Sequence, residues 1–143
     1  MRLSIAEIIK KTVNLQTEEE KIEWLSKNNT LTLRMILRYT YDENIKFLVP
    51  ESRPPWKKNG LIDVEGRLYN ETRRLNIFLK GGKYDGKLKQ HHVERLFIEI
   101  LEGVDDKDAE ILSNMIEKKP IAGISKDVII KAFPNIFEEN FNN

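Results

Sequence analysis

Cysteine is absent from this chain of 143 residues, and so is any long hydrophobic run. The lack of cysteine excludes disulfides, thiol chemistry and cysteine-based metal sites. No apolar stretch approaches the roughly 18 residues that a membrane-spanning helix needs, so we expect no membrane partner. Residues 1–11 mix apolar and charged side chains, which is typical of an amphipathic helix and not of a signal peptide. We therefore expect a cytoplasmic protein.

Residues that carry chemistry are few and poorly grouped. The only histidines, His91 and His92, are neighbours, so on a helix they point to different faces and are poorly placed to share one metal ion. The acidic run from Asp105 to Glu110 lacks the glycine and the ligand spacing of a calcium loop, and a helix start explains it better. Neither a Ser/His/Asp set nor a glycine-rich phosphate loop is visible. The sequence thus predicts no metal, no cofactor and no small-molecule substrate.

What the chain does contain is a mixture of apolar and charged residues, at 40% and 33%, which indicates one globular domain over residues 1–143. Apolar residues recur at helical spacing, so we predict an all-α, bundle-like domain of about six to eight short helices. The expected helices cover residues 4–13, 17–27, 30–41, 70–79, 90–102, 105–116 and 125–133, with a further helical turn or two over 42–49. Residues 50–69 are predicted as an irregular or extended insert, because prolines and Gly60 interrupt the pattern, and residues 138–143 as a tail.

Polar residues that precede the apolar patterns predict where the helices begin. N-caps are expected at Ser4, Thr17, Asn70, Asp105 or Asp106, and Ser125. Thr17 and Glu20 match a capping box, in which each side chain bonds the other residue's backbone N–H. At the end of the helix over 105–116, Lys118-Lys119 suit the negative end of the helix dipole.

Positive charge is concentrated in the middle third, although the net charge is only +1. Residues 51–92 carry 10 Lys and Arg against 5 Asp and Glu, whereas residues 93–143 carry 6 against 11. This asymmetry is compatible with an anionic partner on one face, and an ordinary solvated surface is the alternative. The basic candidates in this third are Lys57, Lys58, Arg73, Arg74, Lys80, Lys83, Lys87 and Lys89.

Two short motifs are suited to contact phosphate. Lys80-Gly81-Gly82-Lys83 places two glycines, which let a backbone approach a phosphate closely, between two cations. Its alternative is a helix C-cap with flanking cations. Gly123-Ile124-Ser125 predicts a capped helix start whose free backbone N–H groups form a site for a phosphate, with Lys126 and Lys131 nearby.

Lys83-Tyr84-Asp85-Gly86 also matches the Lys-x-Asp-Gly motif in which a lysine of nucleotidyltransferases takes up a nucleotide. That chemistry needs a base-binding pocket and acidic metal ligands on other strands. The 57 residues after Gly86 have helical patterns and leave no room for those strands. Because Asp85-Gly86 is good turn chemistry, we interpret the match as a turn and expect no enzyme.

Several segments of the chain follow one another as in a known family. They are Ile8-Ile9, Thr17 to Lys21, Leu33 to Tyr41, Val93 to Glu102, and the stretch from Asp105 to Phe137 with Met115-Ile116, Gly123-x-Ser125 and Lys131-Ala132-Phe133-Pro134. In this order they resemble the helical N-terminal DNA-binding domain of ATP-dependent DNA ligases, particularly of the tailed-phage type. Residues 50–80 match this family least, and Lys118-Lys119-Pro120 departs from its pattern.

The resemblance implies an all-α module that lies on the minor groove of double-stranded DNA and binds phosphates without reading bases. It implies phosphate contacts from Gly123, Ile124 and Ser125, with added charge from Lys126 and Lys131. Lys80, Gly81, Gly82 and Lys83 would form the second contact, and Arg73, Arg74, Lys87 and Lys89 would add basic contacts. The ligase's catalytic domains are absent, so Lys83 does not correspond to the family's adenylated lysine.

We therefore expect a non-catalytic protein that binds double-stranded DNA, nicked or intact, in phage DNA replication or repair, in the cytoplasm of the host. Two alternatives stay open. One is a protein–protein interaction module that kept the fold and lost DNA binding, which the near-zero net charge and the acidic last third favour. The other is a minor virion or assembly component.

Overall fold

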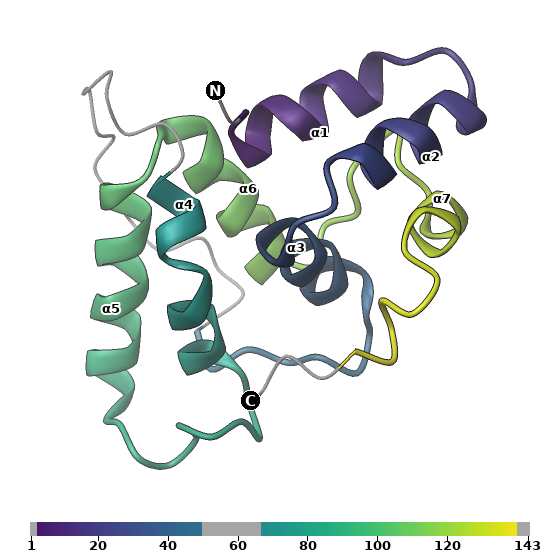
Figure 1. The fold of residues 1–143 in the computed structure, drawn as a ribbon. Helices are drawn as coiled ribbons and strands as arrows, with labels where there is room; N and C mark the ends of the chain where they lie inside the picture. The colour runs from purple at the N-terminus through teal and green to yellow at the C-terminus, as the bar shows by residue number, and fades with distance from the viewer. Residues whose placement is uncertain (1–2, 50–66, 140–143) are drawn as a thin grey trace.

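The computed structural model describes residues 3–49 and 67–139, and every regular element among them is a helix (Figure 1). The elements are α1 (Ile5–Asn14), α2 (Glu18–Lys27), α3 (Leu31–Tyr41), α4 (Arg67–Asn70), the 3-10 helix η2 (Thr72–Phe78), α5 (Gln90–Gly103), α6 (Asp106–Ile116) and α7 (Lys126–Ala132). The predicted all-α class is confirmed. None of the described helices combines the length and apolar character that crossing a membrane requires.

Capping residues place most helix starts where the sequence predicts them. Ser4, Thr17, Asp105 and Ser125 each accept a hydrogen bond from a backbone N–H in the first turn of the helix that follows. Ser4 and Thr17 also belong to complete capping boxes. Because one such cap stabilises a helix by about 1 kcal/mol, these helices have a local reason, besides packing, to begin at these residues.

The apolar faces of the helices meet in one core. α6 packs against α1, α3 and α5, while α2 packs against α1 and α7 (Figure 1). Tyr39, Phe78 and Phe97 are the largest fully buried side chains. Phe78 and Phe97 meet edge to face with ring centroids 5.2 Å apart, a geometry that adds about 0.5–1.5 kcal/mol to the burial of the rings. This pair joins η2 to α5.

A buried carboxylate ties α6 to the start of α1. Asp108 is fully buried, and its Oδ1 accepts a hydrogen bond of 2.8 Å from the backbone N–H of Ala6. Backbone N–H groups in the first turn of a helix have no partner inside that helix, and negative charge is favourable there. Asp108 therefore helps to hold the first helix on the core.

Residues 42–49 are not the helical turns that the sequence predicts. They follow α3 as a turn and an extended stretch, in which Phe47 forms an antiparallel bridge with Leu79. Two backbone hydrogen bonds, of 2.7 and 2.8 Å, join segment 46–48 to segment 78–80. This pairing between distant parts of the chain supplies the backbone partners that a helix would otherwise provide.

Two further sequence predictions are wrong near α4. Residues 67–69, predicted within the irregular insert, belong to α4, and Asn70 ends α4 instead of capping the next helix. The next element is the 3-10 helix η2, which Glu71 precedes without a side-chain capping bond. The rest of the insert, including Trp56 and the basic pair at 57–58, lies outside the described residues.

The predicted C-terminal tail is ordered at its beginning. The guanidinium of Arg34 donates two hydrogen bonds, of 2.9 and 3.1 Å, to the carboxylate of Glu139. Arg38 donates to the backbone carbonyls of Ile136 and Glu139 at 2.7 and 2.8 Å. These bonds hold the chain after α7 against α3, and residues 140–143 lie outside the described part.

Candidate nucleic-acid interface

Residues 80–89, here called the lysine loop, connect η2 to α5 and lie below both elements in Figure 1. The loop carries four exposed lysines and one acidic residue, Asp85. The lysines are Lys80, Lys83, Lys87 and Lys89. None of them forms an ion pair with a carboxylate of the residues that the structure describes. Among the described residues, the four lysines therefore carry exposed positive charge that no ion pair compensates.

Two glycines and one carboxylate determine the shape of the lysine loop. Gly81 and Gly86 have φ angles of +78° and +80°, in the left-handed region that glycine adopts readily. The Oδ2 atom of Asp85 accepts a hydrogen bond of 2.6 Å from the backbone N–H of Gly81, and two backbone hydrogen bonds of 3.1 Å close turns within residues 82–87. The turn predicted at Asp85–Gly86 is confirmed. The lysines thus project from a segment made of consecutive tight turns.

A fifth lysine lies at the base of the loop. Lys46 is exposed, and its backbone carbonyl accepts a hydrogen bond of 2.8 Å from the N–H of Lys80. Sequence reasoning missed Lys46, because it comes next to the loop only through the bridge between distant segments. No local pattern around residue 46 signals this neighbour.

The two predicted arginine contacts lie at the other end of η2 from the lysine loop. Arg74 pairs with the carboxylates of Glu71 at 2.9 Å and Glu99 at 3.9 Å, so its charge is partly compensated. Arg73 is exposed and lines a separate hollow of about 350 Å³ together with Leu31 and other residues of α3, α4 and η2. The structure therefore does not place these arginines within the lysine loop.

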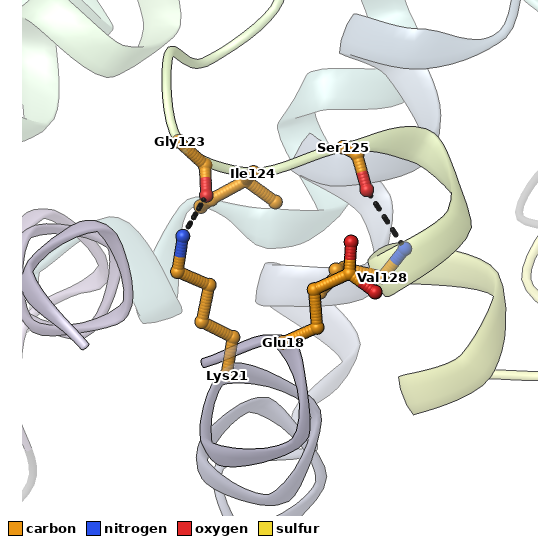
Figure 2. Close-up of a pocket in the computed structure, with 6 residues that line it drawn as sticks. All are labelled: Glu18, Lys21, Gly123, Ile124, Ser125 and Val128. Atoms are coloured by element: carbon orange, nitrogen blue, oxygen red, sulfur yellow. Dashed lines mark hydrogen bonds between the residues drawn. The ribbon is translucent and has the colours of Figure 1, made fainter. Parts of the chain in front are cut away.

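The Gly123-Ile124-Ser125 turn leads into α7, and its polar groups already have partners in the fold (Figure 2). The carbonyl of Gly123 accepts a hydrogen bond of 2.7 Å from Nζ of Lys21, and Oγ of Ser125 accepts one of 3.2 Å from the N–H of Val128. The side chain of Ile124 is buried. The backbone N–H of Ile124 donates to the carbonyl of Ile121 at 3.1 Å, so this turn offers a phosphate fewer free N–H groups than the sequence predicts.

A carboxylate faces the same turn. Glu18 lines a hollow of about 250 Å³ with Lys21 and the turn residues, and Figure 2 shows its side chain directed toward the start of α7. Negative charge near the N-terminus of a helix stabilises the fold. The same charge repels a phosphate that approaches the turn.

The two lysines that accompany this turn are divided along α7. The ammonium of Lys126 lies 4.8 Å from the ring centroid of Phe137, and Lys131 is exposed in the last turn of the helix. In Figure 1, α7 and the lysine loop lie on different sides of α3. The structure does not bring the two predicted phosphate contacts together, and phosphate binding at residues 123–131 stays a prediction.

Shifted pKa values gather at the C-terminal end of α3. Burial lowers the pKa of Lys118 to about 8, and its ammonium donates hydrogen bonds to the backbone carbonyls of Tyr39 and Asp42. Burial alone would raise the pKa of Asp42, but the hydrogen bond from the N–H of Asn44 and the guanidinium of Arg38 bring it below its usual value. Perturbed pKa values often mark functional sites, but here each charged group has a partner within the fold. The sequence assigns Lys118 to the end of α6, whereas its charge lies at the end of α3.

The described residues contain no group of three or more His, Asp or Glu side chains that could hold a metal ion. Fold and surface together define an all-α protein with a basic loop whose lysines have no ion-pair partner in the part of the chain that the structure describes. A family of unknown function, DUF6433, matches residues 8–121, and the chain belongs to this family. The match contains the lysine loop and ends before the turn at 123–125. No curated protein and no solved structure matches the chain.

Proposed function

We propose that the protein binds double-stranded DNA through its phosphates, without reading bases and without catalysis, and that the lysine loop is its main contact. The observation that carries this proposal is the group of four exposed lysines without an acidic partner among the described residues. Lysines that neutralise DNA phosphates release counterions, and this release supplies essentially all of the affinity in sequence-independent binding.

The geometry of the loop favours the backbone of DNA over its bases. A lysine ammonium is a flexible point charge that suits phosphate oxygens, whereas base edges in the major groove are read by a helix or a two-stranded ribbon that enters the groove. The lysine loop is a series of short turns and offers neither element. Contacts of this kind position a protein on a duplex and carry no sequence information.

The resemblance to the DNA-binding domain of DNA ligases supports a duplex as the partner and phage DNA replication or repair as the process. Of the two phosphate contacts that the resemblance implies, the structure favours one. The lysines of the loop at 80–89 have no acidic partner among the described residues. In the turn at 123–125, the hydroxyl of Ser125 and the carbonyls of Gly123 and Ile124 are engaged, and the carboxylate of Glu18 lies in front of the turn. We therefore assign the main contact to the lysine loop.

The test is a comparison of two triple variants in their affinity for a fluorescent duplex, measured by anisotropy at about 50 mM and about 200 mM salt. The loop variant is Lys80→Gln, Lys83→Gln and Lys87→Gln. The control variant is Lys10→Gln, Lys27→Gln and Lys107→Gln, which removes equal charge from exposed lysines outside the loop.

We expect the loop variant to bind more weakly than the native protein at low salt, with a salt slope smaller by about 2–3, because each lost phosphate contact removes about 0.9 from the slope. The control variant should stay within about twofold of the native affinity, since its lysines do not contact the phosphates. An equal loss in both variants would contradict the assignment to the loop. No duplex binding by the native protein at low salt would contradict DNA binding itself.

A further inference from the structure

Three of the four tyrosines are used by the fold. The hydroxyls of Tyr39, Tyr41 and Tyr69 donate hydrogen bonds of 2.7 Å to other residues of the chain. Their rings are buried or pack against the core. These three side chains therefore have structural roles.

Tyr84 differs from the other three in each respect. Its side chain is half-buried, and it is not among the residues that pack against the core. Its hydroxyl makes no hydrogen bond with any described residue. Within the described part of the chain, this half-buried ring on a surface loop therefore has no role in the core, which leaves it available for a ligand.

The surroundings of Tyr84 are cationic and conformationally defined. The ammonium of Lys83 lies 5.9 Å from the centroid of its ring. Its backbone carbonyl accepts a hydrogen bond of 3.1 Å from the N–H of Lys87, and the left-handed Gly86 reverses the chain between them. The ring thus belongs to the same succession of turns as the lysines that we assign to phosphate.

An aromatic ring among cations is the combination with which proteins bind single-stranded nucleic acid, because the ring stacks on a base while the cations neutralise the neighbouring phosphates. One stacked base strengthens binding about 5- to 150-fold. In an intact duplex each base already stacks on its neighbours and pairs with its partner, so the ring gains little there. The ring gains a contact only where a base is unpaired.

We propose that Tyr84 stacks on an unpaired base beside the phosphates that the lysine loop binds, so that the protein prefers DNA with unpaired bases, as in a gap or a flap, to an intact duplex. This inference rests on the proposed function and adds the class of DNA that the loop recognises. Tyr84 supplies the preference, and the lysines supply the affinity that all DNA forms share.

The experiment measures anisotropy with one duplex in two forms, intact and with a short single-stranded gap, for the native protein, Tyr84→Leu and Tyr84→Phe. We expect the native protein and Tyr84→Phe, which keeps the ring, to bind the gapped form about tenfold more tightly. Tyr84→Leu should bind both forms with the affinity of the native protein for the intact duplex. Circular dichroism should show the same unfolding midpoint for all three proteins, since Tyr84 does not pack against the core.

The outcomes separate this inference from the function on which it rests. Binding of both forms without a preference, or a preference that Tyr84→Leu retains, would overturn the role of Tyr84 and leave DNA binding in place. Absence of binding to either form would overturn both. Two further arms, a single-stranded RNA of the gap sequence and vesicles with anionic lipids, complete the test. Tighter binding to RNA than to gapped DNA, or binding to vesicles alone, would overturn the choice of gapped DNA.

Discussion

The side chain of Lys118 directs its ammonium into the fold instead of into solvent. Its backbone has a φ of +58°, and its half-buried ammonium donates to two carbonyls at the end of α3. The last carbonyls of a helix have no partner inside the helix, and a cation beside them is favourable. Burial opposes the charge, which explains why the pKa of Lys118 falls to about 8.

This shift predicts a pH dependence of stability. The pKa of Lys118 is about 8 in the folded protein against a usual value of 10.5, so between these values the unfolded chain binds more protons than the folded protein. The free energy of unfolding therefore rises with pH in this window. Lys118→Met removes the titrating group, so the stability of the native protein relative to this variant should increase as the pH rises from about 8 to about 10.

Urea unfolding of both proteins across this pH range measures the difference, and the titrations of other groups that the two share largely cancel. Lys119→Met is the matched control, because Lys119 is an exposed neighbour with a single ion pair to Glu117. This control shows what the loss of one exposed lysine at a neighbouring position contributes to the difference. A native advantage over Lys118→Met that is constant or falls with pH would contradict the lowered pKa of Lys118 in the folded protein.

At the scale of the elements, the sequence predicts helices well where the signal is local. Ser4, Thr17 and Ser125 precede apolar residues at helical spacing, and each caps the expected helix. The prediction is wrong over 42–49, because the partner of Phe47 is Leu79, which no local pattern connects to it. Pairing between distant segments overrides a weak helical preference, and only the three-dimensional structure shows it.

The candidate site divides in the same way. The lysines of the loop and the turn at Asp85–Gly86 follow from composition and turn chemistry within one segment. The engagement of the turn at 123–125 depends on Lys21 and Glu18, which belong to α2 and reach it only through folding. A sequence shows where lysines gather. It does not show whether a polar group is already hydrogen-bonded to another part of the folded chain.

Two carboxylates, that of Asp85 in the lysine loop and that of Glu18 in α2 beside the turn at 123–125, allow the contacts to be distinguished. Asp85→Asn removes the only acidic charge of the lysine loop and keeps an oxygen that can accept the bond from Gly81. We expect it to tighten duplex binding about two- to threefold at low salt, because a repulsion near the phosphates disappears. Glu18→Gln should leave the affinity unchanged.

Anisotropy with the same labelled duplex provides the measurement for both variants. The opposite result would be tighter duplex binding by Glu18→Gln and an unchanged affinity of Asp85→Asn. It would place the phosphates at the start of α7. The account of the lysine loop would then be wrong.

At the scale of the whole molecule, charge is distributed unevenly around a nearly neutral chain. The net charge is +1, yet the lysine loop carries four exposed cations at one end of the molecule. α2 begins with Glu18, Glu19 and Glu20 and lies on the other side of the molecule in Figure 1. Such an arrangement orients a protein toward an anionic partner. We expect the loop to approach DNA first and α2 to face away from it.

The most direct test of this account is a titration of the isotope-labelled protein with an intact duplex, followed through the backbone amide signals by NMR. The account predicts that the largest shifts occur in residues 80–89 and at Lys46, while the amides of α2 and of residues 123–131 change little. Largest shifts in residues 123–131, or no shifts at any duplex concentration at low salt, would contradict it.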